Sequence, residues 1–185
     1  MENPTEIVKK YNLPDKFFLI SNQFWKHKNH LLVFDALNHL KTKKKIYINI
    51  ILTGRLNTEK EFSQKIIDRI EEYELNNQLF ILGLIPKKDQ FLLMRRSIAV
   101  IQPSLFEGWS TILEETRSIG KNIILSDLEV HKEQNYSKSI FFKKKSYIDL
   151  ADKIENIFCQ FDSGPDFLNE KISADENTYL MKKFA

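Results

Sequence analysis

The chain has 185 residues, a length that suits one domain with a single core, or one domain and a tail. Its 42% hydrophobic and 29% charged residues are typical of a soluble globular protein and exclude a disordered chain. The formal net charge of +3 is mild, and the lysine clusters at residues 41–45 and 143–145 lack the interleaved aromatic residues that a nucleic-acid platform needs. We therefore expect no nucleic-acid partner, and peripheral contact with an anionic membrane surface stays open.

Cysteine content and hydropathy favour a cytoplasmic location. Cys159 is the single cysteine, so no disulfide framework and no cysteine metal site are expected. No apolar run approaches the roughly 20 residues that a membrane-spanning helix needs. The sequence Met1-Glu2-Asn3-Pro4 lacks the basic and apolar regions of a signal peptide. The inner face of a membrane is the alternative location.

Short apolar runs alternate with amphipathic segments along the chain. The runs are typical of strands buried on both faces, and the segments repeat apolar residues at helical intervals. The expected strands are residues 17–20, 46–52, 79–82, 98–101, 122–125 and 140–142. The expected helices are residues 4–12, 32–40, 59–74, about ten residues ending near 96, about 110–119, and 147–161.

This alternation predicts an α/β fold. We expect a Rossmann-like, doubly wound parallel sheet of about six strands, with helices on both faces in three α/β/α layers. Residues 1–16 are expected to form a helix and linker, and Gly164-Pro165 to break the last long helix, so that residues 163–185 form a helical tail. Ligands of such sheets bind beyond the carboxyl ends of the strands, which singles out the loops at residues 21–28, 54–57, 83–86 and 104–110.

The last of these loops runs into a helix. Thr111, followed three residues later by Glu114, has the pattern of a capping box, and Gly120 stands where a C-terminal cap falls. The beginning of a helix presents unpaired backbone N–H groups and the positive end of the helix dipole. The sequence therefore predicts a phosphate site here. Glu107 precedes the helix, and Glu115 lies one turn inside it.

The segment that holds both glutamates has a recognisable pattern. Residues 103–115 read Pro-Ser-Leu-Phe-Glu-Gly-Trp-Ser-Thr-Ile-Leu-Glu-Glu. With the preceding apolar run and the capped helix, this segment closely resembles the signature of the retaining, GT-B-fold glycosyltransferases of the group 1 family (family four). The resemblance covers roughly residues 1–160 and matches the C-terminal, donor-binding half of these enzymes. It implies that residues 1–185 are a single nucleotide-sugar-binding domain and that the N-terminal acceptor domain is absent.

The resemblance also implies roles for particular residues. Glu107 corresponds to the glutamate near the donor sugar, and Glu115 to the glutamate that binds the ribose. Lys28 corresponds to the lysine that neutralises the diphosphate, so Glu107 and Lys28 are the expected catalytic residues. Gln23 stands where an arginine is usual, and whether Lys26 replaces that cation is left open.

Further donor contacts are implied for two segments. Leu84 and Ile85 match the segment that flanks the base, and the backbone N–H groups expected to serve sugar and phosphate are those of Gly108, Trp109, Ser110 and Thr111. The expected donor is a UDP- or GDP-sugar, bound without a cofactor or metal. His27 and His30 are three apart but have no third ligand nearby, so we expect no metal site. Residues 126–134 also resemble a family segment, but we assign them no chemical role.

The implied function is transfer of a sugar, of the hexosyltransferase type, from a nucleotide-sugar to a sugar or lipid-linked acceptor, as in polysaccharide biosynthesis. Residues 1–185 alone are expected to be inactive. One alternative is a non-catalytic nucleotide-sugar-binding module, or a subunit completed by a separate partner chain. Another is a flavodoxin-like regulatory domain, but the chain lacks clustered N-terminal aspartates. The chain also has no Gly-x-Gly-x-x-Gly, Walker or Gly-x-Ser-x-Gly motif, which argues against dinucleotide-binding, NTPase and hydrolase functions.

Overall fold

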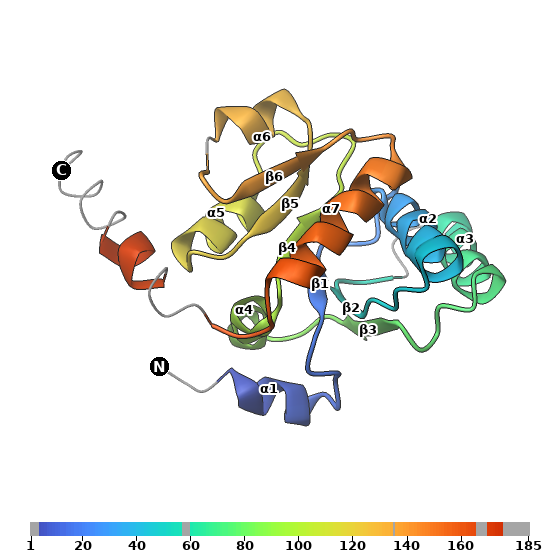
Figure 1. Ribbon diagram of the computed structural model, residues 1–185, viewed down its shortest axis with the longest axis horizontal. Coiled ribbons are helices and arrows are strands. Elements are labelled where there is room, and N and C mark those ends of the chain that lie inside the picture. Colours follow the sequence, from blue (N-terminus) through green and yellow to red (C-terminus); the bar gives the residue numbers. More distant parts are fainter. Residues whose placement is uncertain (1–3, 57–59, 135, 166–169, 176–185) are drawn as a thin grey trace.

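A computed structural model of the chain describes residues 4–56, 60–134, 136–165 and 170–175. Within these residues the strands form one six-stranded sheet in the order β3-β2-β1-β4-β5-β6, and all neighbouring strands are parallel. Helices cover both faces of this sheet (Figure 1). The predicted three-layer, Rossmann-like fold is therefore confirmed.

The elements follow one another in nearly strict alternation. The strands are β1 (Phe18–Ser21), β2 (Ile50–Thr53), β3 (Leu79–Gly83), β4 (Val100–Gln102), β5 (Ile123–Ser126) and β6 (Ser139–Phe142). The helices are α1 (Thr5–Lys10), α2 (His30–His39), α3 (Lys60–Glu72), α4 (Lys87–Arg96), α5 (Thr111–Ser118), α6 (Glu129–Glu133) and α7 (Tyr147–Gln160). A 3₁₀ turn (Lys26–Lys28) precedes α2, and a π-helical turn (Leu40–Lys44) follows it.

The core lies on both faces of the sheet because successive side chains of a strand point in opposite directions. In β1, Phe18 and Ile20 belong to the hydrophobic cluster that contains the buried side chains of α2, α3 and α7. Leu19 points the other way, into the cluster shared with α1, α4 and α5. This two-sided burial explains why the strands read as continuous apolar runs without polar alternation.

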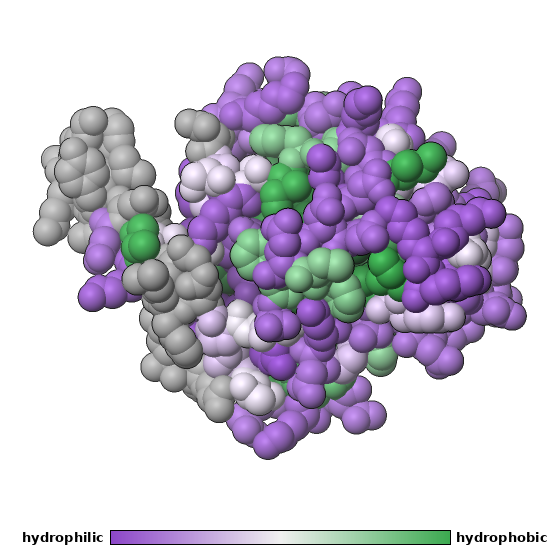
Figure 2. All heavy atoms as spheres, viewed as in Figure 1, coloured by the Kyte–Doolittle hydropathy of each residue, from purple (hydrophilic) through white to green (hydrophobic). Residues whose placement is uncertain are grey.

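Charged and polar side chains dominate one face of the molecule. The face shown in Figure 2 is mostly hydrophilic, and hydrophobic residues appear on it in separate small groups. Among the described residues, no helix is both long enough and apolar enough to cross a membrane.

Three local predictions were wrong. The second strand begins at Ile50 and not at residue 46, because its partner β1 offers its first paired residue, Phe18, opposite Ile50. A short helix, α6, occupies part of residues 127–136, where we predicted none. The predicted capping box is also absent, because Ser110 is the N-cap of α5 and Thr111 is already its first helical residue.

The described part of the predicted tail packs against the domain. The backbone N–H of Phe17 donates to Ser163 Oγ at 3.2 Å, and residues 170–175 are helical. The Arg95 guanidinium and the Glu170 carboxylate form an ion pair, with Nε and Oε1 2.7 Å apart and both side chains about nine-tenths buried. Outside the described residues lie 166–169 and 176–185 of the predicted tail, 1–3 of the predicted linker, 57 of the predicted loop 54–57 and 59 of the predicted helix 59–74.

Candidate functional site

The candidate site lies at the centre of the sheet, beyond the carboxyl ends of β1 and β4. The strand order runs outward from this pair in both directions, and open parallel sheets bind ligands at such a switch point. Two cavities, of about 250 Å³ and about 110 Å³, lie here and share Ser21, Asn22, Lys28 and Gln90 in their walls. We call them together the crevice. A larger groove, of about 850 Å³, lies between α1 and α4 and is lined by none of the predicted site residues.

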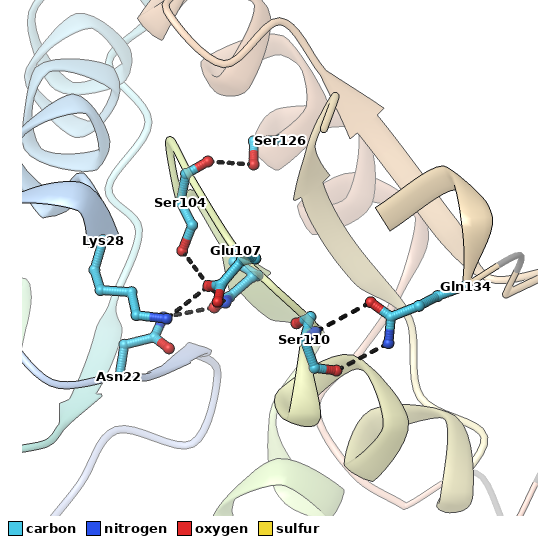
Figure 3. A network of polar contacts seen from close by, with 8 residues as sticks. Asn22, Lys28, Ser104, Glu107, Ser110, Ser126 and Gln134 are labelled. Atoms are coloured by element: carbon cyan, nitrogen blue, oxygen red, sulfur yellow. Dashed lines mark hydrogen bonds and ion pairs between the residues drawn. The ribbon is translucent and has the colours of Figure 1, made fainter. Parts of the chain in front are cut away.

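Glu107 is held in the crevice by three donors that converge on one carboxylate oxygen, Oε1 (Figure 3). Lys28 Nζ and Gln102 Nε2 each donate from 2.6 Å, and Ser104 Oγ donates from 2.7 Å. Asn22 in turn donates to Gln102 Oε1 at 2.6 Å, which fixes the orientation of that amide. The Lys28 and Glu107 side chains are only 12% and 10% exposed, so water screens their ion pair weakly.

Glu115 has one occupied and one open carboxylate oxygen. Its Oε1 pairs with Lys87 Nζ, whereas its buried Oε2 has no hydrogen-bond partner among the described residues. The hydroxyl of Ser110, which lines the same smaller cavity, is likewise buried without a partner. Buried polar groups are normally hydrogen-bonded, so these two atoms are available to a ligand.

Gln134 fixes the beginning of α5. Its side chain accepts the backbone N–H of Ser110 at 3.2 Å and donates from Nε2 to the Ser110 carbonyl at 3.0 Å (Figure 3). The same Nε2 lies 2.7 Å from Glu114 Oε1. The N–H of Ser110 is therefore already paired in the free protein, and its service to a ligand stays a prediction. The side-chain hydroxyl of Ser110 remains unpaired instead.

Gln23 joins the loop after β1 to the turn after β2. Its Oε1 accepts the backbone N–H of Arg55 at 2.8 Å, and the residue lines the wider cavity. The two segments approach closely at Gly54, where an added Cβ would lie 2.1 Å from the carbonyl oxygen of Asn22. Gly54 also has a φ of +115°, a backbone conformation that residues other than glycine rarely adopt. Gln23 thus lines the wider cavity, and its side-chain oxygen supports a neighbouring turn.

The structure brings together most of the other predicted residues. Leu84 and Ile85 line the wider cavity, and Thr111 lines the smaller one. Three predicted residues are exposed and line neither cavity: Lys26, Gly108 and Trp109. Lys26 is thus poorly placed to replace the cation missing at Gln23.

Residues 126–134, to which we assigned no role, contact the residues that line the crevice. His131 is buried, and its Nδ1 donates to the carbonyl oxygen of Ser126 at 2.8 Å. Burial lowers the pKa of His131, although this hydrogen bond to Ser126 and, less strongly, the nearby Glu107 carboxylate oppose the shift. Ser126 Oγ donates to the carbonyl of Ser104, the residue that holds Glu107 (Figure 3).

The sequence carries little signal for the residues that we missed. Asn22 and Gln102 are 80 positions apart and meet because β1 and β4 are neighbours in the sheet. Lys87 could have been noticed, because a lysine at the beginning of a helix opposes the helix dipole. No group of three histidine, cysteine or acidic side chains that could hold a metal occurs in the part of the chain that the structure describes. Metal-independent binding stays a prediction.

Comparisons with known proteins identify the family and the fold of the chain. The family model for glycosyl transferases group 1 matches residues 4–160. A glycosyltransferase from Rickettsia africae matches 98% of this chain with 20% identity and a TM-score of 0.75, over 47% of its own length. HepE from Anabaena in complex with UDP matches 97% with 15% identity and a TM-score of 0.76, over 52% of its length. Sucrose-phosphate synthase from Thermosynechococcus elongatus matches 84% with 16% identity and a TM-score of 0.72, over 40% of its length.

The chain spans about half the length of these solved structures, and identities this low show a shared fold. No curated protein sequence matches the chain. The family model covers most of the 185 residues, from α1 to the end of α7. The chain therefore belongs to the group 1 glycosyltransferases and has the fold of one half of a GT-B enzyme.

Proposed function

We propose that the chain is the donor-binding domain of a retaining glycosyltransferase. The full enzyme would move a sugar from a UDP- or GDP-sugar to a sugar or lipid-linked acceptor in the cytoplasm, as in polysaccharide biosynthesis. One observation carries the proposal: Lys28, from the loop after β1, and Glu107 and Glu115, from the segment after β4, line one small cavity with the beginning of α5. HepE, which shares the fold, has been solved with UDP and with UDP-glucose, and this supports a nucleotide-sugar as the ligand.

The diphosphate is proposed to bind between Lys28 and the beginning of α5. The first backbone N–H groups of a helix and its positive dipole end favour anions. A lysine that is 12% exposed adds a poorly screened positive charge on the opposite wall. Both features stabilise the negative charge that grows on a diphosphate leaving group as the glycosidic bond breaks.

Glu115 is proposed to bind the ribose of the donor. A carboxylate accepts hydrogen bonds from both hydroxyls of a vicinal diol, and the buried Oε2 of Glu115 has an unused acceptor position. The base would then extend into the wider cavity, beside Leu84 and Ile85. Main-chain groups and apolar packing in this cavity would then distinguish uracil from guanine.

Glu107 is proposed to lie beside the donor sugar. Its carboxylate would accept sugar hydroxyls and favour positive charge at the anomeric carbon in the transition state. Without a donor, Lys28 neutralises this carboxylate. When the diphosphate binds, Lys28 can donate to it while Gln102 and Ser104 continue to hold Glu107 in place.

Substitution of Glu115 tests this proposal. Glu115→Ala removes the ribose acceptor, so the affinity for UDP or GDP should fall by about 1.5–3 kcal/mol, the usual range for hydrogen bonds to a charged group. Isothermal titration calorimetry measures the change. Glu129→Ala, which removes an exposed glutamate on α6, is the matched control and should leave the affinity unchanged. Equal nucleotide affinity of Glu115→Ala and the wild type would rule out the ribose role.

The same titrations are run with and without a chelator. We propose that binding needs no divalent metal, because cations and helix N–H groups already face the diphosphate. Loss of nucleotide binding in the chelator would contradict this and would indicate a different mode of diphosphate recognition.

A further inference from the structure

We propose that Lys87 is a second cation of the diphosphate site, which Glu115 holds until a nucleotide takes its place. This inference rests on the proposed function, because it concerns the same crevice. It assigns the missing positive charge to the beginning of α4, the helix after β3, although the resemblance placed that charge in the loop after β1.

The charges in the smaller cavity are paired before any ligand arrives. Among the described residues that line it, the cationic side chains are Lys28 and Lys87, and the anionic ones are Glu107 and Glu115. Lys28 pairs with Glu107, and Lys87 pairs with Glu115. A diphosphate that enters this cavity without freeing a lysine would meet two carboxylates whose countercharges are already engaged.

Lys87 stands at a position where a positive charge is unfavourable in the free protein. It is the first residue of α4, and Lys88 follows it, so two cations precede the one acidic residue of the first turn, Asp89, at the positive end of the helix dipole. Departures from such local rules are expected where a function compensates for them. An anion bound next to α4 would be stabilised by both the helix end and the ammonium group.

The two ion pairs differ in how easily they can separate. The Lys87 side chain is 56% exposed, whereas that of Lys28 is 12% exposed. Lysine has a long, flexible side chain, so the Lys87 ammonium can turn from the carboxylate to a phosphate within the same cavity. Ribose hydroxyls would then take its place on Glu115, so that neither charged group loses a partner.

The test compares a nucleoside diphosphate with its nucleoside. Wild type and Lys87→Met are titrated with UDP or GDP, whichever the wild type binds more tightly, and with uridine or guanosine to match. Lys87→Met should weaken diphosphate binding by about 10- to 100-fold, as expected for a hydrogen bond between charged groups. Nucleoside binding should stay equal or become tighter, because Glu115 no longer has a competing partner.

Two further variants show whether the effect belongs to Lys87. Lys88→Met changes the next lysine, which lines the groove between α1 and α4 and not the crevice, and should leave diphosphate affinity unchanged. Lys26→Met tests the other candidate cation.

The inference is overturned if Lys26→Met causes the loss of diphosphate affinity and Lys87→Met does not. It is also overturned if Lys87→Met weakens nucleoside and diphosphate equally, because Lys87 would then act only on the shape of the site. A wild type that binds neither UDP nor GDP would overturn the proposed function itself.

Discussion

The carboxylates of the crevice show how single residues can be prepared for a ligand in the free protein. Glu107 is held by three donors on one oxygen, and Glu115 by one lysine on one oxygen. A buried carboxylate without such partners would lose much of its solvation energy. In the proposed function, donor binding at these residues is an exchange of hydrogen-bond partners.

His30, the first residue of α2, makes the stability of the domain depend on pH. It is fully buried, stacks on Phe24 with ring centres 4.4 Å apart, and has no hydrogen-bond partner for either ring nitrogen among the described residues. Burial lowers its pKa from the ordinary 6.5 to about 3, and the charge of Lys28 adds to this effect. The folded state therefore keeps the ring neutral while the unfolded chain takes up a proton below pH 6.5.

The resulting stabilisation is complete above pH 6.5 and is lost as the pH falls from 6.5 towards 3. His30→Phe and His30→Leu remove this loss, so from pH 7.5 to pH 5 each variant should gain about 2 kcal/mol relative to the wild type. Urea denaturation at several pH values measures the difference. Packing defects shift a variant by the same amount at every pH, so a difference that does not change with pH would contradict the assignment.

Which site residues can be predicted depends on how far apart their partners lie in the sequence. Glu107 and Glu115 belong to one short segment, and their spacing around the beginning of a helix is visible without a structure. Gln102 and Asn22 become part of the site only through the neighbouring positions of β1 and β4. Gln134 contacts Ser110 from 24 positions away, through a helix that the local pattern did not indicate.

At the scale of elements, alternation of strands and helices was predictable, whereas several boundaries were not. Hydrophobic periodicity reports burial, and the strands of this sheet are buried on both faces. A strand begins where a partner strand is available to pair with it. The sequence of one strand does not show where its partner begins. Residues 46–49 illustrate this, since they continue the apolar pattern of β2 but precede its first pair, Ile50 with Phe18.

The contact between α6 and α5 is expected to stabilise the whole donor site. Gln134 is 4% exposed and satisfies both backbone groups of Ser110. Gln134→Ala would leave the buried N–H of Ser110 without its partner, whereas the Ser110 carbonyl keeps the Glu114 N–H, and the expected cost is about 1–3 kcal/mol in the free energy of unfolding. Urea denaturation measures the cost, and hydrogen exchange should show faster exchange of the Ser110 amide.

An exposed glutamine provides the comparison for this variant. Gln64→Ala on α3 removes a side chain of the same type, whose bond to Asp68 lies on the surface, and should change stability by less than about 0.5 kcal/mol. If Gln134→Ala destabilises the protein no more than Gln64→Ala, the contact with Ser110 does not secure the beginning of α5.

At the scale of the whole molecule, the carboxyl edge of the sheet carries large apolar side chains that remain in contact with water. They lie on the loops around the crevice and are Trp25, Leu84, Leu105, Phe106 and Trp109. Exposed apolar groups beside a polar site commonly mark a surface that another body covers. The chain also spans about half the length of the solved structures that it matches. Both observations support the proposal that a second domain or subunit closes over the donor.

We therefore predict that residues 1–185 alone bind the donor but transfer no sugar. Transfer requires the acceptor hydroxyl to be held against the anomeric carbon with water excluded, and in our proposal the covering partner supplies this geometry. Its absence should lower the rate by several orders of magnitude, since positioning can contribute roughly 7–11 kcal/mol to the barrier. Turnover assays with nucleotide-sugars and simple sugar acceptors measure the rate of transfer, with Glu107→Ala as the variant that removes the proposed sugar contact.

Rapid transfer that depends on Glu107 would mean that this domain carries a complete active site. Nucleotide binding without transfer, followed by transfer when the covering partner is added, is the result that we expect.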